Sequence, residues 1–172
     1  MKTRHIIPAA LFASALLSTL LCPGAHGQSF PSGKPSQSTA KLEAVQYLYP
    51  EQLTLPAGKT SPVALHFRIE PGFHINSHAP KDDFFIPTVF SIPADAGVKL
   101  ETASYPPGAD FVLPADPDTK LSVYTGNFTI QARLTAEPGD HLVNAKLRYQ
   151  ACDRTACMPP KTITVPIDIV GK

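Results

Sequence analysis

Prolines are the feature of this sequence that most limits its possible folds. The 172 residues include 19 prolines, which are spread along the chain. A proline inside a helix costs about 3 kcal/mol, because it has no backbone N–H to donate and its ring clashes with the preceding turn. No apolar period of 3.6 residues extends beyond the N-terminal segment. The sequence therefore argues against long helices and favours short strands joined by turns.

Four segments support this interpretation, because apolar and polar residues alternate along them with the period of a half-buried strand. They are residues 63–69, 128–134, 143–151 and 163–169. Pro166 lies in the last segment and cannot donate to a neighbouring strand, so we expect an edge position or a bulge there. Pro-Gly, Ala-Gly and Pro-Pro turns punctuate the chain. Together these patterns predict an all-β fold, an antiparallel β-sandwich.

The N-terminus has the pattern of an export signal over residues 1–27. Lys2 and Arg4 supply a basic start, residues 9–21 supply an apolar run, and Ala25-His26-Gly27 has small residues at the positions that a signal peptidase reads. The apolar run is too short for a stable membrane span, which needs about 20 residues. We therefore expect cleavage near Gly27 and a periplasmic or otherwise exported protein.

Cys22 offers an alternative, in which a lipid is attached to a cysteine that follows the apolar run. Thr19-Leu20-Leu21 lacks the small residue expected before a lipidated cysteine, so we do not expect a lipoprotein. Residues 28–40 are rich in Ser, Pro, Gly, Gln and Lys, which predicts a flexible linker. Residues 41–172 are then one domain, large enough to have its own core.

The charge and hydropathy of the mature chain limit its partners. Cleavage changes the formal net charge from +1 to −1, because Lys2 and Arg4 leave and no acidic residue does. This balance gives no reason to expect nucleic acid as a partner. No second apolar stretch approaches membrane-spanning length, so we expect no membrane span in the mature chain.

Cleavage also leaves only two cysteines, Cys152 and Cys157, which can pair only with each other. They lie at the expected tip of a hairpin between residues 141–151 and 161–170. A structural bridge across so short a loop stabilises by roughly 2 kcal/mol, and such bridges are common in exported proteins. A redox-active bridge needs an accessible sulfur and a partner thiolate able to attack in line, and a hairpin tip offers the access. From these residues alone both interpretations stay open.

The neighbours of the pair suggest how it is placed. Cys152 continues the alternation of Arg148 and Gln150, so we expect its side chain to start from the polar outer face of the strand. Arg154 and Lys161 would favour a thiolate electrostatically. Asp153 is a candidate proton acceptor, but an aspartate in this position more often forms a turn.

The segment around the pair, Leu147 to Pro160, resembles the N-terminal periplasmic domain of DsbD, the thiol:disulfide interchange protein. The shared residues are Leu147-Arg148-Tyr149-Gln150-Ala151-Cys152 and Cys157-Met158-Pro159-Pro160. The resemblance extends upstream and covers about residues 41–170. The upstream pieces are residues 71–76, 86–88, 105–108 and 121–126.

This resemblance implies an immunoglobulin-like sandwich with a reversible disulfide and the activity of a thiol-disulfide oxidoreductase, a protein-disulfide reductase type of electron carrier. Cys157 would form mixed disulfides with partners and Cys152 would resolve them, without a metal or organic cofactor. The electron donor would be a thioredoxin-like domain of a membrane electron transporter, which we expect to be a separate protein. The acceptor would be a periplasmic disulfide isomerase or a cytochrome-maturation thioredoxin.

Three differences from the family concern the surroundings of the disulfide. Four residues separate the cysteines here, where better-studied members have five. Those members shield the site with an aromatic residue on a cap loop. The matching residues here, 115–118, include Asp116 and no aromatic, so we expect shielding to differ or to come from Phe111 or Tyr124. His74 and Asn76 replace tyrosines that line the site in the family.

The sequence allows two other interpretations, a metal site and a binding module. His74 and His78, with acidic residues nearby, would make a metal site if a helix placed both on one face, but the surrounding prolines argue against a helix. We therefore expect no metal. The alternative function is a non-catalytic exported β-sandwich that binds a protein partner, in which the disulfide is structural and only stiffens the hairpin.

Overall fold

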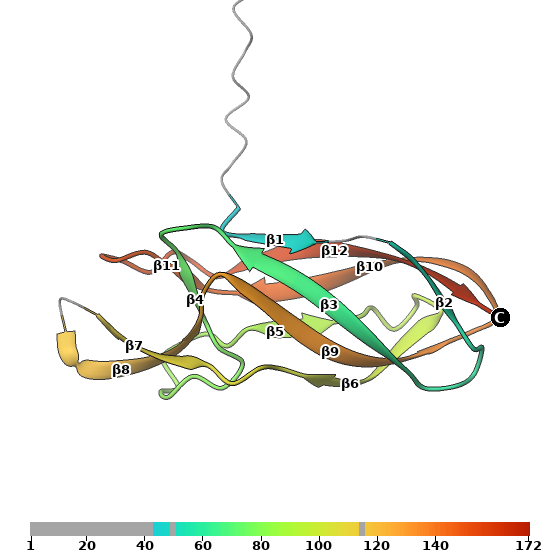
Figure 1. Ribbon diagram of the computed structural model, residues 1–172, viewed down its shortest axis with the longest axis horizontal. Helices are drawn as coiled ribbons and strands as arrows, with labels where there is room; N and C mark the ends of the chain where they lie inside the picture. The colour runs from blue at the N-terminus through green and yellow to red at the C-terminus, as the bar shows by residue number, and fades with distance from the viewer. Residues whose placement is uncertain (1–42, 49–50, 114–115) are drawn as a thin grey trace, which may run out of the picture. The chain divides into compact units, whose positions relative to one another are not determined.

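The computed structural model describes residues 43–48, 51–113 and 116–172, with only the backbone of Asp116. The expected signal peptide over residues 1–27 and linker over residues 28–40 lie outside this part. The regular structure of the described part consists of strands in three four-stranded sheets (Figure 1). No helix there is long and apolar enough to cross a bilayer. The all-β prediction is confirmed.

Two of the sheets form the layers of the sandwich (Figure 1). Their neighbouring strands are antiparallel, apart from β2, which runs parallel to β12. The first sheet has the order β1 (Val45–Leu48), β3 (Ser61–Ile69), β9 (Asn127–Ala136), β6 (Val98–Ser104). The second sheet has the order β2 (Gln52–Leu55), β12 (Lys161–Gly171), β10 (Gly139–Tyr149), β5 (Val89–Ser91).

One apolar cluster forms the core of the sandwich. Every second residue of β3 from Val63 and of β9 from Phe128 is buried in it, and β10 and β12 contribute buried residues with the same period. Phe67 is fully buried, and its ring centroid lies 5.1 Å from that of Phe128 and 5.4 Å from that of Tyr47. Because burying apolar surface contributes roughly 25 cal/mol per Å², this cluster is the main source of the stability of the fold.

Three of the four predicted strands are confirmed as β3, β9 and β12. The segment 143–151 is not one strand: β10 ends at Tyr149, and Ala151 belongs to a short strand of the third sheet. The expected hairpin is confirmed, since β10 pairs with β12 from Gly139 opposite Gly171 to Tyr149 opposite Lys161. Pro166 also lies as expected, because β2 pairs with β12 only beyond it and leaves an edge there.

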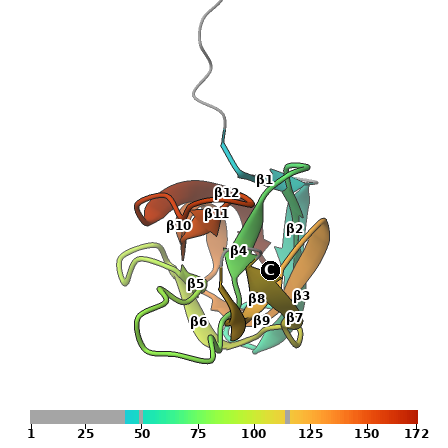
Figure 2. The same cartoon turned by 90° about the vertical axis from the view of Figure 1, so that its left-hand side faces the viewer.

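The third sheet continues strands of both sandwich layers at one end of the domain (Figures 1 and 2). The sheet has the order β11 (Ala151–Cys152), β4 (His74–Asn76), β8 (Asp116–Tyr124), β7 (Ala109–Leu113). β3 leads into β4 through Gly72, and β8 leads into β9 through Gly126, both at positive φ values that suit glycine (91° and 59°). β10 leads into β11 across Gln150. The third sheet therefore places β4 directly beside the strand that carries Cys152.

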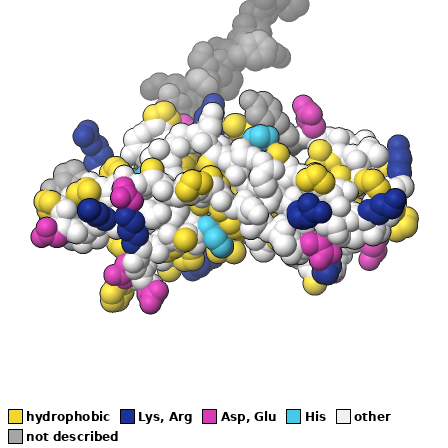
Figure 3. Space-filling model, turned by 60° about the horizontal axis from the view of Figure 1, so that its bottom comes forward, with side chains coloured by type: hydrophobic (Ala, Val, Ile, Leu, Met, Phe, Trp, Pro, Cys, Tyr) yellow, Lys and Arg dark blue, Asp and Glu magenta, His cyan; other side chains and the backbone are white. Residues whose placement is uncertain are grey.

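Charged side chains of both signs are interspersed on the face shown in Figure 3. Ion pairs in the described part include Lys81 with Asp110 at 2.6 Å and Lys99 with Glu101 at 2.9 Å. Exposed pairs of this kind contribute little to stability, because water and salt screen their charges. The mixture fits the near-neutral charge of the sequence.

Candidate functional site

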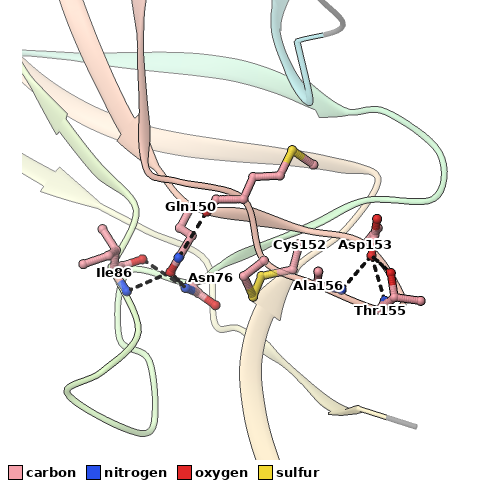
Figure 4. Close-up of a disulfide and its surroundings, with 9 residues drawn as sticks. Asn76, Ile86, Gln150, Cys152, Asp153, Thr155 and Ala156 are labelled. Carbon is pink, nitrogen blue, oxygen red and sulfur yellow. Dashed lines mark hydrogen bonds between the residues drawn. A yellow bond between two sulfur atoms is a disulfide. The ribbon is translucent and has the colours of Figure 1, made fainter. Parts of the chain in front are cut away.

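Cys152 and Cys157 form a disulfide at the tip of the β10–β12 hairpin (Figure 4). Their sulfur atoms lie 2.05 Å apart and their Cα atoms 3.9 Å apart. The chain turns back between them: Asp153 N donates to Ala156 O at 3.0 Å, and Met158 N donates to Ala151 O at 2.8 Å. Backbone hydrogen bonds therefore hold the two cysteines next to each other on either side of a tight turn.

The two cysteines differ completely in exposure. Cys152 has an exposed fraction of 0%, whereas Cys157 belongs to an exposed run that continues through the two prolines after it. The expected alternation holds, because Tyr149 and Ala151 belong to the core cluster and Cys152 does not. The face expected to be polar and outward is nevertheless covered at Cys152, since the strand enters the third sheet and the turn through Cys157 folds back against it.

Asp153 shapes the turn between the cysteines. Its Oδ1 accepts hydrogen bonds from Thr155 N at 2.7 Å, Thr155 Oγ1 at 2.8 Å and Ala156 N at 2.8 Å (Figure 4). These bonds hold the pKa of Asp153 below its ordinary value of 3.8, mainly through the two backbone N–H groups. The carboxylate is thus a hydrogen-bond acceptor for the turn, as the turn-forming interpretation expects.

A partly buried amide network connects this turn to the rest of the domain. Asn76 Nδ2 donates to Ile86 O at 3.2 Å and to Gln150 Oε1 at 3.1 Å. Gln150 Oε1 also accepts from Ile86 N at 3.4 Å, and Gln150 Nε2 donates to Met158 O at 3.2 Å (Figure 4). Three segments meet at these two side chains: β4, the loop after it, and the residue that follows Cys157.

Replacing Asn76 by alanine is expected to destabilise the domain by about 1–3 kcal/mol, because it removes a buried side chain and the hydrogen bonds that it donates to two partly buried acceptors. The side chain is 1% exposed. Urea denaturation of the oxidised protein measures the change, with Asn144→Ala on the exposed face of β10 as the control. Equal stability of the two variants would show that the network contributes nothing.

His74 lies opposite Cys152 in the pairing of β4 with β11. Its side chain is 3% exposed, and its ring centroid is 4.2 Å from that of Phe111 on β7. Burial lowers the pKa of His74 below its ordinary value of 6.5, and the nearby Asp153 carboxylate opposes part of that shift. Of the two aromatic residues expected as shields, Phe111 is thus the one that covers a neighbour of the cysteine pair.

Tyr124 lies elsewhere. Its ring stacks on Phe128 with a centroid distance of 5.1 Å, and its hydroxyl donates to Pro106 O at 2.9 Å. Tyr124 is paired with Ile75, so alternation places it on the opposite face of the sheet from His74. Asp116 begins β8 and pairs with Leu113, and its side chain lies outside the described part.

The two histidines weighed as metal ligands make separate contacts. The His78 ring stacks on Tyr105 at 3.8 Å, and its Nδ1 lies 2.9 Å from Thr88 O. No group of three or more His, Cys, Asp or Glu side chains that could hold a metal occurs among the described residues. Of the two cations expected near the sulfurs, Lys161 pairs with Glu43 at 2.9 Å and Arg154 is exposed.

The family model for the N-terminal part of the thiol:disulfide interchange protein DsbD matches residues 41–169. The chain belongs to the DsbD N-terminal family. This confirms the resemblance found in the residues around the cysteine pair, and the immunoglobulin-like sandwich that it implied.

Among solved structures, the chain is similar to the reduced N-terminal domain of DsbD from Neisseria meningitidis. The identity is 21% and the TM-score 0.44, over 67% of this chain and 82% of that chain. No curated protein matches the chain.

Gln150 is the site residue that sequence reasoning missed in this member of the DsbD N-terminal family. The alternation of the sequence places it on the polar face, where a glutamine is typically solvated. The structure instead connects it to Asn76, Ile86 and Met158. The sequence feature that could have pointed to Gln150 is its position two residues before Cys152. In the structure the chain crosses there from one sheet to another.

Proposed function

We propose that this protein is a periplasmic thiol–disulfide exchange module that relays reducing equivalents through a reversible Cys152–Cys157 disulfide. The observation that carries the proposal is the unequal exposure of the two bonded cysteines, one exposed and one fully buried. Exchange requires one sulfur that partners can reach and a second that attacks it from within the same chain. Membership of the DsbD N-terminal family supports the same role.

In the proposed reaction a thiolate of the donor attacks Cys157 Sγ. The Cys152–Cys157 bond breaks, and Cys152 leaves with the electron pair and takes up a proton. The second donor thiolate then attacks the mixed disulfide, which oxidises the donor and releases reduced Cys157. With an acceptor disulfide the steps run in reverse, so each cycle passes two electrons without a metal or an organic cofactor.

The partners we propose follow from the family. The donor is a thioredoxin-like domain linked to a membrane electron transporter, and the acceptor is a periplasmic disulfide isomerase or a cytochrome-maturation thioredoxin. The exposed run from Cys157 to Pro160 supports such contacts, because Met158 is 38% exposed beside the reactive sulfur. An extended apolar segment next to a sulfur can pack against a partner while the sulfurs exchange.

The reduction potential of the purified mature domain tests this function. We expect a value above about −300 mV, within reach of thioredoxin-like partners. Equilibration in buffers of defined dithiol and disulfide ratio, followed by alkylation of free thiols and mass measurement, gives the value. A potential well below this limit would mark a structural bridge and favour the binding-module alternative. The mature domain treated with excess dithiol, which alkylates at two thiols, provides the fully reduced reference.

A further inference from the structure

His74 is a buried titratable side chain placed directly across from the buried cysteine. Residues opposite each other in an antiparallel pair have Cβ atoms about 4.5–5.5 Å apart and project from the same face. His74 and Cys152 are such a pair, with exposed fractions of 3% and 0%. The His74 Nε2 atom is buried and has no hydrogen-bond partner. A buried polar atom without a partner is uncommon and calls for an explanation.

The groups around His74 come from several elements. Phe111 of β7 packs on the ring. A cavity of about 470 Å³ beside it is also lined by Thr125, by Glu70 at the end of β3, and by Arg154 in the turn after β11. Asp153 in the same turn acts on His74 through its charge. One cation and two carboxylates therefore belong to the surroundings of the imidazole, which lies across the strand pair from the cysteine that leaves and returns during exchange.

We propose that His74 is the base that accepts the proton of the Cys152 thiol when this sulfur resolves a mixed disulfide on Cys157. The inference rests on the proposed exchange function. The thiol proton moves to Nε2 as Cys152 Sγ attacks Cys157 Sγ. The bond between Cys157 and the partner sulfur breaks, and the partner leaves as a thiolate with the electron pair. His74 then returns the proton to solvent.

The buried position of Cys152 explains why a base is needed. Water reaches an exposed thiol and carries its proton away, but Cys152 is fully buried when the bridge is formed. Burial in apolar surroundings also disfavours a thiolate. Neutral imidazole is available near pH 7, because burial lowers the pKa of His74. Its free Nε2 can accept the hydrogen bond that a reduced Cys152 would otherwise lack.

Two variants test the inference with the reduced mature protein and the chromogenic disulfide DTNB. In the first phase Cys157 attacks DTNB and releases one coloured thiolate, at a rate that depends on the DTNB concentration. In the second phase Cys152 resolves the mixed disulfide and releases a second coloured thiolate, at a rate that does not depend on the DTNB concentration. His74→Phe keeps a ring against Phe111, and His74→Gln keeps a polar side chain, but neither has a basic nitrogen. His78→Gln, four residues on, is the matched control.

Both variants are expected to slow the second phase by about tenfold or more and to leave the first phase within about twofold, which is the effect of losing a general base. Their second phase should also keep rising with pH where that of the unmodified protein has levelled off. The role of His74 would be overturned if the second phase of the variants were as fast as that of the unmodified protein, or if only one variant were slowed. It would also be overturned if the first and second phases were slowed equally. Absence of a second phase in the unmodified protein would instead overturn the exchange function itself.

Discussion

Replacing Cys152 by alanine is expected to turn this protein into a trap for its partners. Cys157 is exposed and remains able to attack a partner disulfide, which releases one partner sulfur as a thiolate and leaves the other bonded to Cys157. The mixed disulfide then persists, because no sulfur in the same chain lies within reach to displace the partner. A neighbouring thiol acts at a high effective concentration, so its removal should lengthen the life of the adduct by orders of magnitude.

The Cys157→Ala variant is the matched comparison, since it keeps the buried sulfur and loses the exposed one. In that variant Cys152 is a free thiol, but its exposed fraction in the structure is 0%. Partners should not reach it, so we expect essentially no adducts. Both proteins are produced in the periplasm, alkylated at once, and separated without reductant. Adducts that disappear on adding a dithiol support the assigned roles. Equal trapping by both variants, or trapping by neither, would contradict them.

The largest effect on stability is expected at Phe67. Its side chain is 0% exposed and touches aromatic rings of two neighbouring strands, those of Tyr47 on β1 and Phe128 on β9. Phe67→Ala should lower the free energy of unfolding by about 3–5 kcal/mol, because it removes apolar contacts and leaves a cavity in a closely packed core. For a domain of ordinary stability this is a large share of the total.

Phe84→Ala is the control for this prediction, because the Phe84 side chain is 90% exposed. The same chemical change should there alter the free energy of unfolding by less than about 0.5 kcal/mol. Urea titrations of the oxidised proteins, followed by far-UV circular dichroism, measure both values. Similar values for the two variants would mean that the aromatic cluster of the sandwich is not what holds the fold together.

Much of the fold was predictable from local patterns. Alternation along residues 63–69 and 128–134 identified β3 and β9, since a sheet buried on one face requires that period. The placement of Pro166 at an edge followed from its missing N–H. The third sheet was not predictable in this way. Its strand β4 has only three residues, all of them buried, so it shows no alternation at all.

The candidate site was also predictable only in part from the sequence. The pairing of Cys152 with Cys157 followed from counting cysteines, and the turn formed by Asp153 followed from the usual preference of aspartate. The burial of Cys152 did not follow, because alternation only tells which face a side chain is on. Whether that face meets water depends on what folds over it. The same reason explains why the partly buried hydrogen bond between Gln150 and Asn76 was not predictable.

The sequence by itself determined the β-sandwich and the single disulfide, because strand alternation, proline positions and cysteine number act over a few residues. It also carried the DsbD N-terminal resemblance that the family model confirms. Only the tertiary structure decided which of the two cysteines is exposed and that His74 stands opposite the buried one. Residues 74 and 152 are far apart in sequence, and their meeting depends on strands of both sandwich layers that continue into one further sheet.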